Sequence, residues 1–236
     1  MAVVVVGGHS RNIGKTSVVA GLIAAMPQMR WTAFKITQFG HGICSANGDP
    51  CDCETDAHLV AVAEEKDAAS GTDSARFLLA GAERSFWVRT RQGNLAAAMP
   101  RVRRELLAIH ASGGNALIES NSVLRFLQPD LYLAVLDAAT ADFKDSARAY
   151  LDRADAVLLR QTGLALRPLW TGVSWKLVEN KPRFVIGPPE YMTSEVAAFV
   201  RDSLASPARA NVVPASVHGK GLASAQDLVG SPVSRF

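Results

Sequence analysis

Four consecutive valines, Val3 to Val6, are followed directly by a glycine-containing segment and then by a long apolar stretch. The valines are typical of a strand buried on both faces, and the apolar stretch that runs to Met26 has helical length. Between them lies Gly-Gly-His-Ser-Arg-Asn-Ile-Gly-Lys-Thr-Ser. A strand, a glycine-rich turn, Gly-Lys-Thr and a helix in this order predict a phosphate-binding loop.

The groups that such a loop needs are present between Gly8 and Ser17. Successive backbone N–H groups form a concave nest for phosphate oxygens, and the positive end of the helix dipole adds to it. Lys15 is expected to reach the β- and γ-phosphates, and the Thr16 hydroxyl to bind Mg²⁺. The motif predicts a phosphate-binding set of Gly8, Asn12, Ile13, Gly14, Lys15, Thr16 and Ser17. It departs from the usual G-x-x-x-x-G-K-[ST] because His9 stands at the first glycine position.

Short apolar segments alternate with helical patterns along the rest of the chain. Strands are predicted at 31–36, 84–90, 116–119, 131–136, 156–160 and 183–186, and helices at 74–81, 95–111, 143–153 and 193–204. This alternation is typical of βαβ units. We therefore expect an α/β fold of the phosphate-loop NTPase type, a three-layer sandwich with a mostly parallel sheet of about seven strands and helices on both faces.

Two stretches interrupt the alternation. Residues 37–72 are long for a strand-to-helix connection and rich in Gly, Cys, Asp and His, and loops of this length are usually functional or disordered. Residues 206–236 are rich in Ser, Ala, Pro and Gly. The expected organisation is one NTPase domain over 1–205, with a Cys/His-rich insertion at 37–72, followed by a weakly packed tail at 206–236.

Charge and hydropathy argue against several classes of partner. The formal net charge of +3 is small and spread along the chain, and the arginines between Arg76 and Arg104 are interpreted as a solvated face. No apolar run approaches the roughly eighteen residues of a membrane span, and no secretory signal is evident. We expect a cytoplasmic protein with no nucleic-acid or membrane partner, whose three cysteines form no structural disulfide.

Carboxylates at strand ends are candidates for the metal side of a nucleotide site. Glu119 closes the predicted strand 116–119, where an acid helps to hold Mg²⁺ directly or through water; the alternative is a solvent-facing carboxylate. Asp137, after the next strand, is a weaker candidate at the same sheet edge. Asp73 is well placed as the N-cap of the following helix, a role that leaves room for a contact with Mg²⁺ or attacking water.

Two cations add to these candidates. Lys35 ends the predicted strand 31–36, where it either neutralises phosphate or an anionic second substrate, or is a snorkelling edge residue. Arg11 lies inside the loop, where it either stabilises charge on a transferred phosphoryl group, in its own subunit or across a dimer, or is simply exposed. The predicted catalytic residues are therefore Lys15, Asp73, Glu119 and Arg11.

All three cysteines lie within eighteen positions together with two histidines: His41, Cys44, Cys51, Cys53 and His58. Thiolates with imidazole suit tetrahedral Zn²⁺, and we favour the three cysteines with one of the histidines. A bound ion would also explain how so long a loop is ordered. The alternatives are free thiols and an iron–sulfur cluster, which would typically need a fourth cysteine.

Four segments together carry a family resemblance: GGHSRNIGKTSVVAGLI at 7–23, FKIT at 34–37, GTDSARFLLAGA at 71–82 and ALIES at 116–120. They resemble the MobB family, nucleotide-binding accessory proteins of molybdopterin-guanine dinucleotide synthesis. That family belongs to the phosphate-loop class that also holds dethiobiotin synthetase, the nitrogenase iron protein and signal-recognition GTPases. The resemblance covers roughly residues 2–119 and fades after that.

The resemblance implies GTP or ATP binding with weak hydrolysis, a Mg²⁺ ion, a homodimer and a helper role beside a partner enzyme of cofactor biosynthesis. By this resemblance, Gly14, Lys15, Thr16 and Ser17 bind phosphate and magnesium. Asp73 and Arg76 belong to a switch-like segment, and Glu119 lies on the metal side of the site. There are departures from the family. Ser120-Asn121-Ser122 replaces the usual glycine, the cysteine-rich insertion is atypical, and Arg160-Gln161-Thr162-Gly163 stands where a guanine-reading Asn-Lys-x-Asp is expected.

The predicted function is nucleoside triphosphate binding with slow, Mg²⁺-dependent hydrolysis, in an accessory protein of cofactor maturation such as that of the molybdenum cofactor. One alternative is an ATP-dependent small-molecule kinase or ligase resembling dethiobiotin synthetase, in which Lys35 and Glu119 hold a carboxylate or phosphate substrate. Another is a metal-binding chaperone or sensor, in which nucleotide sets the conformation and the cysteine-rich loop handles the ion.

Overall fold

The computed structural model describes residues 1–39, 60–163 and 168–206. Residues Met1–Ser206 form one compact unit. The tail predicted at 206–236 lies outside the described residues from position 207 onward.

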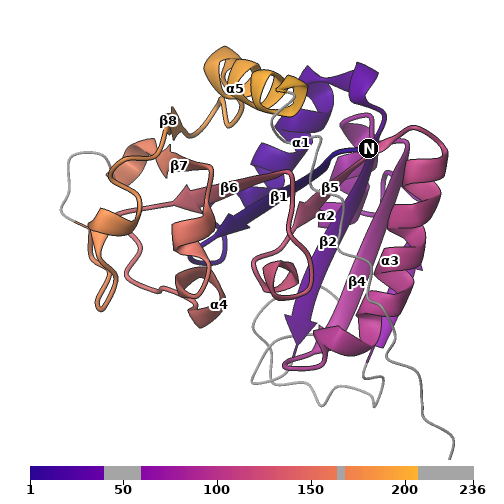
Figure 1. Cartoon of the computed structure of the whole chain (residues 1–236), viewed down its shortest axis with the longest axis horizontal. Coiled ribbons are helices and arrows are strands. Elements are labelled where there is room, and N and C mark those ends of the chain that lie inside the picture. The colour runs from indigo at the N-terminus through magenta and orange to yellow at the C-terminus, as the bar shows by residue number, and fades with distance from the viewer. Residues whose placement is uncertain (40–59, 164–167, 207–236) are drawn as a thin grey trace, which may run out of the picture. The chain divides into compact units, whose positions relative to one another are not determined.

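An eight-stranded sheet forms the centre of this unit, in the order β3-β4-β2-β5-β1-β6-β7-β8 (Figure 1). The strands are β1 (Val3–Gly8), β2 (Trp31–Phe39), β3 (Val60–Glu64), β4 (Arg84–Arg91), β5 (Asn115–Glu119), β6 (Leu131–Leu136), β7 (Ala156–Arg160) and β8 (Arg183–Ile186). Neighbouring strands run parallel except β3, which is antiparallel to β4. The predicted α/β class with a mostly parallel sheet is confirmed, with one strand more than expected.

Helices cover both faces of the sheet (Figure 1). They are α1 (Lys15–Ala25), α2 (Asp73–Leu79), α3 (Leu95–Ala111), α4 (Asp145–Arg148) and α5 (Ser194–Ala205), with 3-10 turns η1 (Pro27–Met29), η2 (Ser122–Arg125), η3 (Leu151–Arg153), η4 (Gln161–Gly163) and η5 (Trp175–Leu177). Within the described ranges, no helix has the length and apolar character needed to cross a bilayer.

The run of valines in β1 is explained by the helices on both faces of the sheet. Val4 and Val6 belong to the core cluster that includes residues of α1, α2 and α5, whereas Val5 belongs to the cluster that includes residues of α3. All three side chains are fully buried. A central strand with helices on both faces needs an apolar residue at every position, which is what the sequence supplies.

Treating residues 37–72 as one connection is wrong at both ends. Thr37–Phe39 continues β2, and Val60–Glu64 forms the edge strand β3. Val60 and Val62 pack against the core from alternate positions of β3, which is the period expected of a strand with one covered face. The polar composition around this five-residue strand concealed that period. Residues 40–59 lie outside the described residues.

The single helix predicted at 143–153 is also wrong. Helix α4 spans only Asp145–Arg148, and Leu151–Arg153 forms the 3-10 turn η3. Phe143, Ala147 and Leu151 are all buried, and their spacing of four residues produced the helical pattern. At Lys144 the backbone is extended, with φ −59° and ψ 138°, and its N–H donates to the carbonyl oxygen of His9 at 2.8 Å. This tether to the loop after β1 delays the start of the helix.

Candidate functional site

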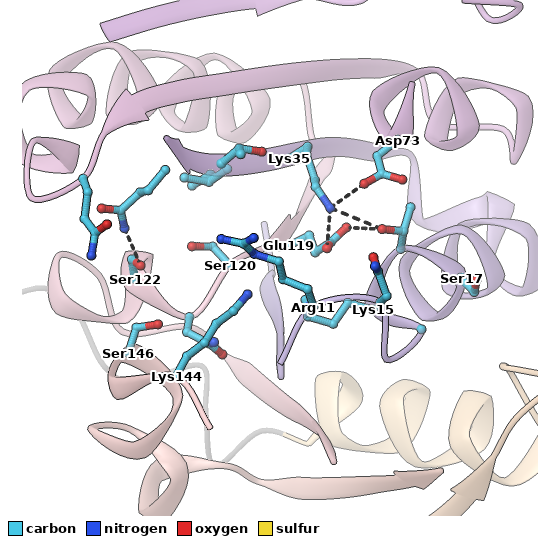
Figure 2. Close-up of a pocket in the computed structure, with 18 of the residues that line it drawn as sticks. Arg11, Lys15, Ser17, Lys35, Asp73, Glu119, Ser120, Ser122, Lys144 and Ser146 are labelled. Carbon is cyan, nitrogen blue, oxygen red and sulfur yellow. Dashed lines mark hydrogen bonds and ion pairs between the residues drawn. The ribbon is translucent and has the colours of Figure 1, made fainter. Parts of the chain in front are cut away.

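A cavity of about 800 Å³ lies beyond the carboxyl ends of β1, β2, β4 and β5. Ligands of open α/β sheets bind at this edge. Seven parts of the chain line the cavity. They are Arg11, Asn12 and Gly14 to Ser17; Lys35 to Gln38; Asp73 and Arg76; Gln92 and Gly93; Glu119 to Ser122; Lys144 to Ser146; and Tyr191. Figure 2 shows Arg11, Lys35 and Lys144 extending into it from different elements.

The loop between β1 and α1, part of which lines this cavity, contains backbone donors without acceptors in the described part of the chain. Within the described residues, the N–H groups from Ser10 to Ser17 have no protein acceptor. Helix α1 begins at Lys15, and its N-cap, Gly14, provides no side-chain hydrogen bond. The first turn of α1 also contains no acidic residue. Orphan N–H groups at a helix N-terminus attract anions, and the helix dipole acts in the same direction.

Two glycines, Gly7 and Gly14, are required because the side chains of Asn121 and Tyr191 lie very close to them. A Cβ at Gly7 would lie 2.1 Å from Oδ1 of Asn121. Gly14 has φ 96°, and a Cβ there would lie 2.2 Å from Cε1 of Tyr191. The positive φ alone disfavours a side chain at Gly14, so both positions depend on glycine for physical reasons.

Asn121 also braces the loop. Gly8 donates its N–H to Oδ1 of Asn121 at 2.8 Å, and Nδ2 of Asn121 donates to the Gly8 carbonyl at 2.8 Å. The predicted phosphate contact at Gly8 is therefore not made by its N–H, which is already used. Gly8 instead shapes the loop, and Ile13, another predicted binding residue, is buried within it. The Ser-Asn-Ser segment that departs from the family pattern thus has a structural role.

His9, which replaces the first glycine of the motif, joins the loop to the chain beyond β6. It is fully buried; Nδ1 donates to the Asp142 carbonyl at 2.7 Å, and Nε2 accepts the Asp137 N–H at 2.9 Å. Its ring stacks on Phe143 with a centroid separation of 5.0 Å. Burial lowers the pKa of His9, so the ring is neutral and its one donor and one acceptor nitrogen match these two partners.

An ionic network occupies one part of the cavity, centred on Lys35 (Figure 2). Its Nζ lies 2.6 Å from Oε1 of Glu119 and 2.6 Å from Oδ2 of Asp73, and donates to the Thr16 hydroxyl at 3.3 Å. Thr16 in turn donates to Oε2 of Glu119 at 2.9 Å. The sheet register creates the pair, because Lys35 of β2 lies beside Glu119 of β5. The three N–H groups of the ammonium therefore all have protein partners.

The charges in this network stabilise one another. Burial alone would lower the pKa of Lys35, but the carboxylates of Glu119 and Asp73 outweigh it and raise that pKa. Burial alone would raise the pKa of Asp73, but Lys35 outweighs it and lowers that pKa. Glu119 is almost fully buried, at 3% exposure of its side chain. A buried carboxylate in such a position depends on its cationic partner.

Two predicted details of this network are corrected. Lys35 does not end its strand, because β2 continues to Phe39. Asp73 is not the N-cap of α2; Thr72 is, and its hydroxyl accepts the Ala75 N–H at 3.1 Å. Because Thr72 caps the helix, the Asp73 carboxylate is free to pair with Lys35.

A second group of cations in the cavity has no such compensation. Nζ of Lys15 donates to the Ser10 carbonyl, and burial lowers the pKa of Lys15 to about 8. Burial, reinforced by the nearby charges of Lys15 and Arg11, lowers the pKa of Lys144 to about 7. No carboxylate of the described residues lies within ion-pair distance of Lys144 or Arg11. Sequence reasoning missed Lys144, because the helical pattern at 143–153 gave it no special position.

The remaining candidates separate into three groups. Asp137 does not line the cavity; it accepts the Ala139 N–H and lies 3.9 Å from Nε of Arg160. Ser17 and Arg76 do line it, and Nη2 of Arg76 donates to the Ser17 hydroxyl at 3.2 Å. The proposed zinc ligands, His41, Cys44, Cys51, Cys53 and His58, lie outside the described residues. Among the residues that are described, no three His, Cys, Asp or Glu side chains form a metal-binding group.

No protein family model matches this chain, and no curated protein matches it. Solved structures to which it is similar include LpxK from Aquifex aeolicus in complex with ATP, at 18% identity and a TM-score of 0.44, covering 78% of this chain and 53% of that one. Another is HypB from Helicobacter pylori in complex with nickel, at 13% identity and a TM-score of 0.45, covering 85% and 84%. The chain thus spans about half the length of LpxK. Similarity at this level concerns the arrangement of the chain and carries no conclusion about its ligands.

Proposed function

We propose that this chain binds a Mg²⁺-bound nucleoside triphosphate in the cavity and hydrolyses it slowly. The observation that carries the proposal is the run of backbone N–H groups from Ser10 to Ser17 that have no acceptor among the described residues; all of these residues except Ser10 and Ile13 line the cavity. Donors of this kind are met by water in an open cavity, and a ligand with oxygen acceptors can take the place of that water. A polyphosphate supplies oxygen acceptors at the spacing of successive amides.

The residues beside the loop fit a magnesium ion. The Thr16 hydroxyl and Oε2 of Glu119 lie 2.9 Å apart at the cavity edge. Hydroxyl, carboxylate and phosphate oxygens are the ligands that Mg²⁺ prefers, with water completing the shell. Thr16 and Glu119 would hold the ion. Bound there, it would neutralise charge that develops on the β- and γ-phosphates.

The other groups have separate roles in this proposal. The loop amides and Lys15 position the phosphates, and Arg11 stabilises charge on the γ-phosphate during its transfer to water. Lys35 holds the Glu119 and Asp73 carboxylates in place through its two contacts of 2.6 Å. Asp73 then orients the attacking water. The chemistry is mainly positioning and electrostatic stabilisation.

The biological setting that we propose rests on the sequence resemblance. Likeness to the MobB family over roughly 2–119 supports an accessory protein of cofactor maturation, acting as a homodimer beside a partner enzyme and using GTP or ATP. A second candidate function, an ATP-dependent kinase or ligase, is supported by the extension of the cavity past the phosphate loop to Gln38, Gln92 and Ser122. Such an extension offers space for an acceptor molecule.

The proposal is tested first with Lys15→Ala. Because a charge-assisted contact contributes about 1.5–3 kcal/mol, the variant is expected to lose roughly tenfold or more in affinity for MgATP or MgGTP. Isothermal titration calorimetry with both nucleotides measures this. Lys176→Ala is the matched control, because Lys176 is exposed and does not line the cavity. Equal affinity in Lys15→Ala and the parent would remove Lys15 from the site and with it the proposed function.

The two candidate functions are separated by how fast the diphosphate is released. A hydrolase releases it at the same basal rate whatever small molecule is added. A kinase or ligase releases it faster when its acceptor is present. Elemental analysis of the purified chain, together with mass identification of any co-purified nucleotide, tests the zinc prediction and identifies the base.

A further inference from the structure

Lys144 is a cation of the cavity for which the protein itself provides no anion. In the part of the chain that the structure describes, its ammonium group has no hydrogen-bond acceptor and no carboxylate within ion-pair distance. Lys35, in the same cavity, uses all three of its N–H groups on protein oxygens. An unpaired and partly buried ammonium is unfavourable. A ligand anion would compensate it.

The backbone at Lys144 is fixed relative to the phosphate loop. Its N–H donates to the His9 carbonyl at 2.8 Å, and two further hydrogen bonds of 2.7 Å join Asp142 to the loop, one from the Ser10 hydroxyl and one from the His9 ring. The stacking of His9 on Phe143 adds to these contacts. Three successive residues, 142 to 144, are thus attached to residues 9 and 10. The histidine that replaces the usual glycine therefore holds Lys144 beside the loop.

The direction of the side chains agrees with a shared target. Figure 2 shows the Lys144 ammonium and the Arg11 guanidinium directed toward the centre of the cavity, with Lys15 to the right of Arg11 in this view. Lys15 and Arg11 are also the positive charges that act most strongly on Lys144. Among the described residues, none of these three cations has a carboxylate within ion-pair distance, although Glu119 and Asp73 attract Lys15 from farther away. A group of cations of this kind favours the binding of an anion.

The charge of the cavity identifies this anion as part of the nucleotide. Among the described residues that line it, five basic side chains and three carboxylates leave a net charge of +2: Arg11, Lys15, Lys35, Arg76 and Lys144 against Asp73, Glu119 and Asp145. A Mg²⁺-bound triphosphate carries about two negative charges at neutral pH, because four phosphate charges meet two of the metal. When Lys15 and Lys144 are protonated in the complex, the nucleotide alone balances the lining, and no positive charge remains for a second anionic substrate.

We propose that Lys144 contacts the γ-phosphate of the bound triphosphate and, together with Arg11, makes the site selective for triphosphate over diphosphate. This inference rests on the proposed function and extends it. It also implies that the acceptor of the phosphoryl group is uncharged: water, or a neutral hydroxyl compound in the second candidate function. Loss of the γ-phosphate on hydrolysis would leave Lys144 without its partner again.

Calorimetric titration of MgATP, MgADP, MgGTP and MgGDP into the parent, Lys144→Ala and Lys144→Arg tests this proposal. We expect Lys144→Ala to lose about tenfold in triphosphate affinity, as the loss of one charge-assisted contact implies, with diphosphate affinity changed by less than about twofold. Lys144→Arg should retain most of the triphosphate affinity, because it keeps the charge. Lys176→Ala again serves as the exposed control.

Proton uptake gives a second readout that a purely structural role would not change. At pH 8 Lys144 is mostly neutral in the free protein and becomes charged when it meets the γ-phosphate, so titrations in buffers of different ionisation enthalpy should show uptake that Lys144→Ala reduces. The other charged groups near Lys144 are Lys15, Arg11, Lys35 and Asp142. They remain in the variant, so the difference between the two proteins reports the loss of Lys144 together with its electrostatic effect on Lys15.

Each outcome has a distinct meaning. If the parent binds none of the four nucleotides, the proposed function fails. If the parent binds triphosphate and Lys144→Ala binds it equally well, only the role of Lys144 is overturned. Equal losses for triphosphate and diphosphate would also overturn it, because the contact would then lie on the α- or β-phosphate. Thermal melting of each variant confirms that it is folded.

Discussion

Lys35 and Lys144 line the same cavity, yet their surroundings are opposite. Lys35 lies between the carboxylates of Glu119 and Asp73, which raise its pKa. Lys144 faces other cations, and burial lowers its pKa to about 7. The first lysine is compensated by the protein and holds the site together in the absence of ligand. The second has no such partner among the described residues, and we propose that a ligand supplies it. One residue type in one cavity thus stands in two opposite electrostatic settings.

The largest effect is expected from Glu119→Gln, which removes the partner that distinguishes Lys35 from Lys144. The carboxylate is proposed to assist Mg²⁺, so we expect the single-turnover hydrolysis rate of MgATP or MgGTP to fall about 10²-fold, as for loss of one electrostatic contact in other enzymes. Binding of nucleotide without Mg²⁺ should be preserved, because Glu119 repels phosphate rather than attracting it. A variant that hydrolyses at the parent rate would exclude Glu119 from the metal side.

Replacement of Lys35 by methionine is expected to destabilise the ligand-free protein. It leaves the buried Glu119 carboxylate and the Asp73 carboxylate without their cation. Removal of one partner from a buried pair costs about 3 kcal/mol or more, and partial exposure of Asp73 reduces this to about 2 kcal/mol. Urea unfolding measures the difference. Because the pKa of Lys35 is raised, its contribution to stability is complete below the ordinary lysine pKa and is lost as the pH rises through the folded-state pKa.

Lys144→Met is expected to change the free energy of unfolding in the opposite direction to Lys35→Met. Its effect should be the smallest of the three substitutions. Removal of an ammonium that lacks a carboxylate partner should raise the free energy of unfolding at pH 7 by about 1 kcal/mol, after allowance for partial exposure. A variant less stable than the parent would show that the protein does compensate Lys144. The comparison between the two lysines would then lose its basis.

The pH dependence sharpens this prediction. The folded protein releases the Lys144 proton near pH 7, whereas the unfolded chain retains it to about pH 10.4. Between these values the unfolded state binds more protons, so the stability of the parent rises with pH. The advantage of Lys144→Met over the parent should therefore shrink as pH increases from 7 to 9. Lys15, whose pKa is also lowered, is present in both proteins, so its own burial contributes to the pH dependence of both.

Prediction from the sequence succeeded where the signal is local. The valine strand, the Gly-Lys-Thr turn and the helix after it are contiguous, and each depends on residues within a few positions of one another. The helix predicted at 95–111 is found at Leu95–Ala111, because a 17-residue amphipathic pattern is hard to mistake. The placement of Glu119 at the end of a strand also followed from the local pattern.

Prediction failed where a distant contact changes the meaning of a local pattern. The apolar spacing at 143–153 predicts one helix, but the hydrogen bond from Lys144 to His9 holds the segment extended at its start. The sequence predicts Asp73 as the N-cap, whereas Thr72 has that role in the structure. His9 departs from the motif, and its ring links the loop to Asp142.

By itself, the amino-acid sequence determined the α/β architecture and the position of the phosphate loop, because hydrophobic period and glycine placement act over short distances along the chain. The tertiary structure alone decided which cations have partners. Register brings Glu119 against Lys35, while no carboxylate comes within ion-pair distance of Lys144 among the described residues. Electrostatic compensation depends on distances through space, and residues more than eighty positions apart meet only after the sheet has formed.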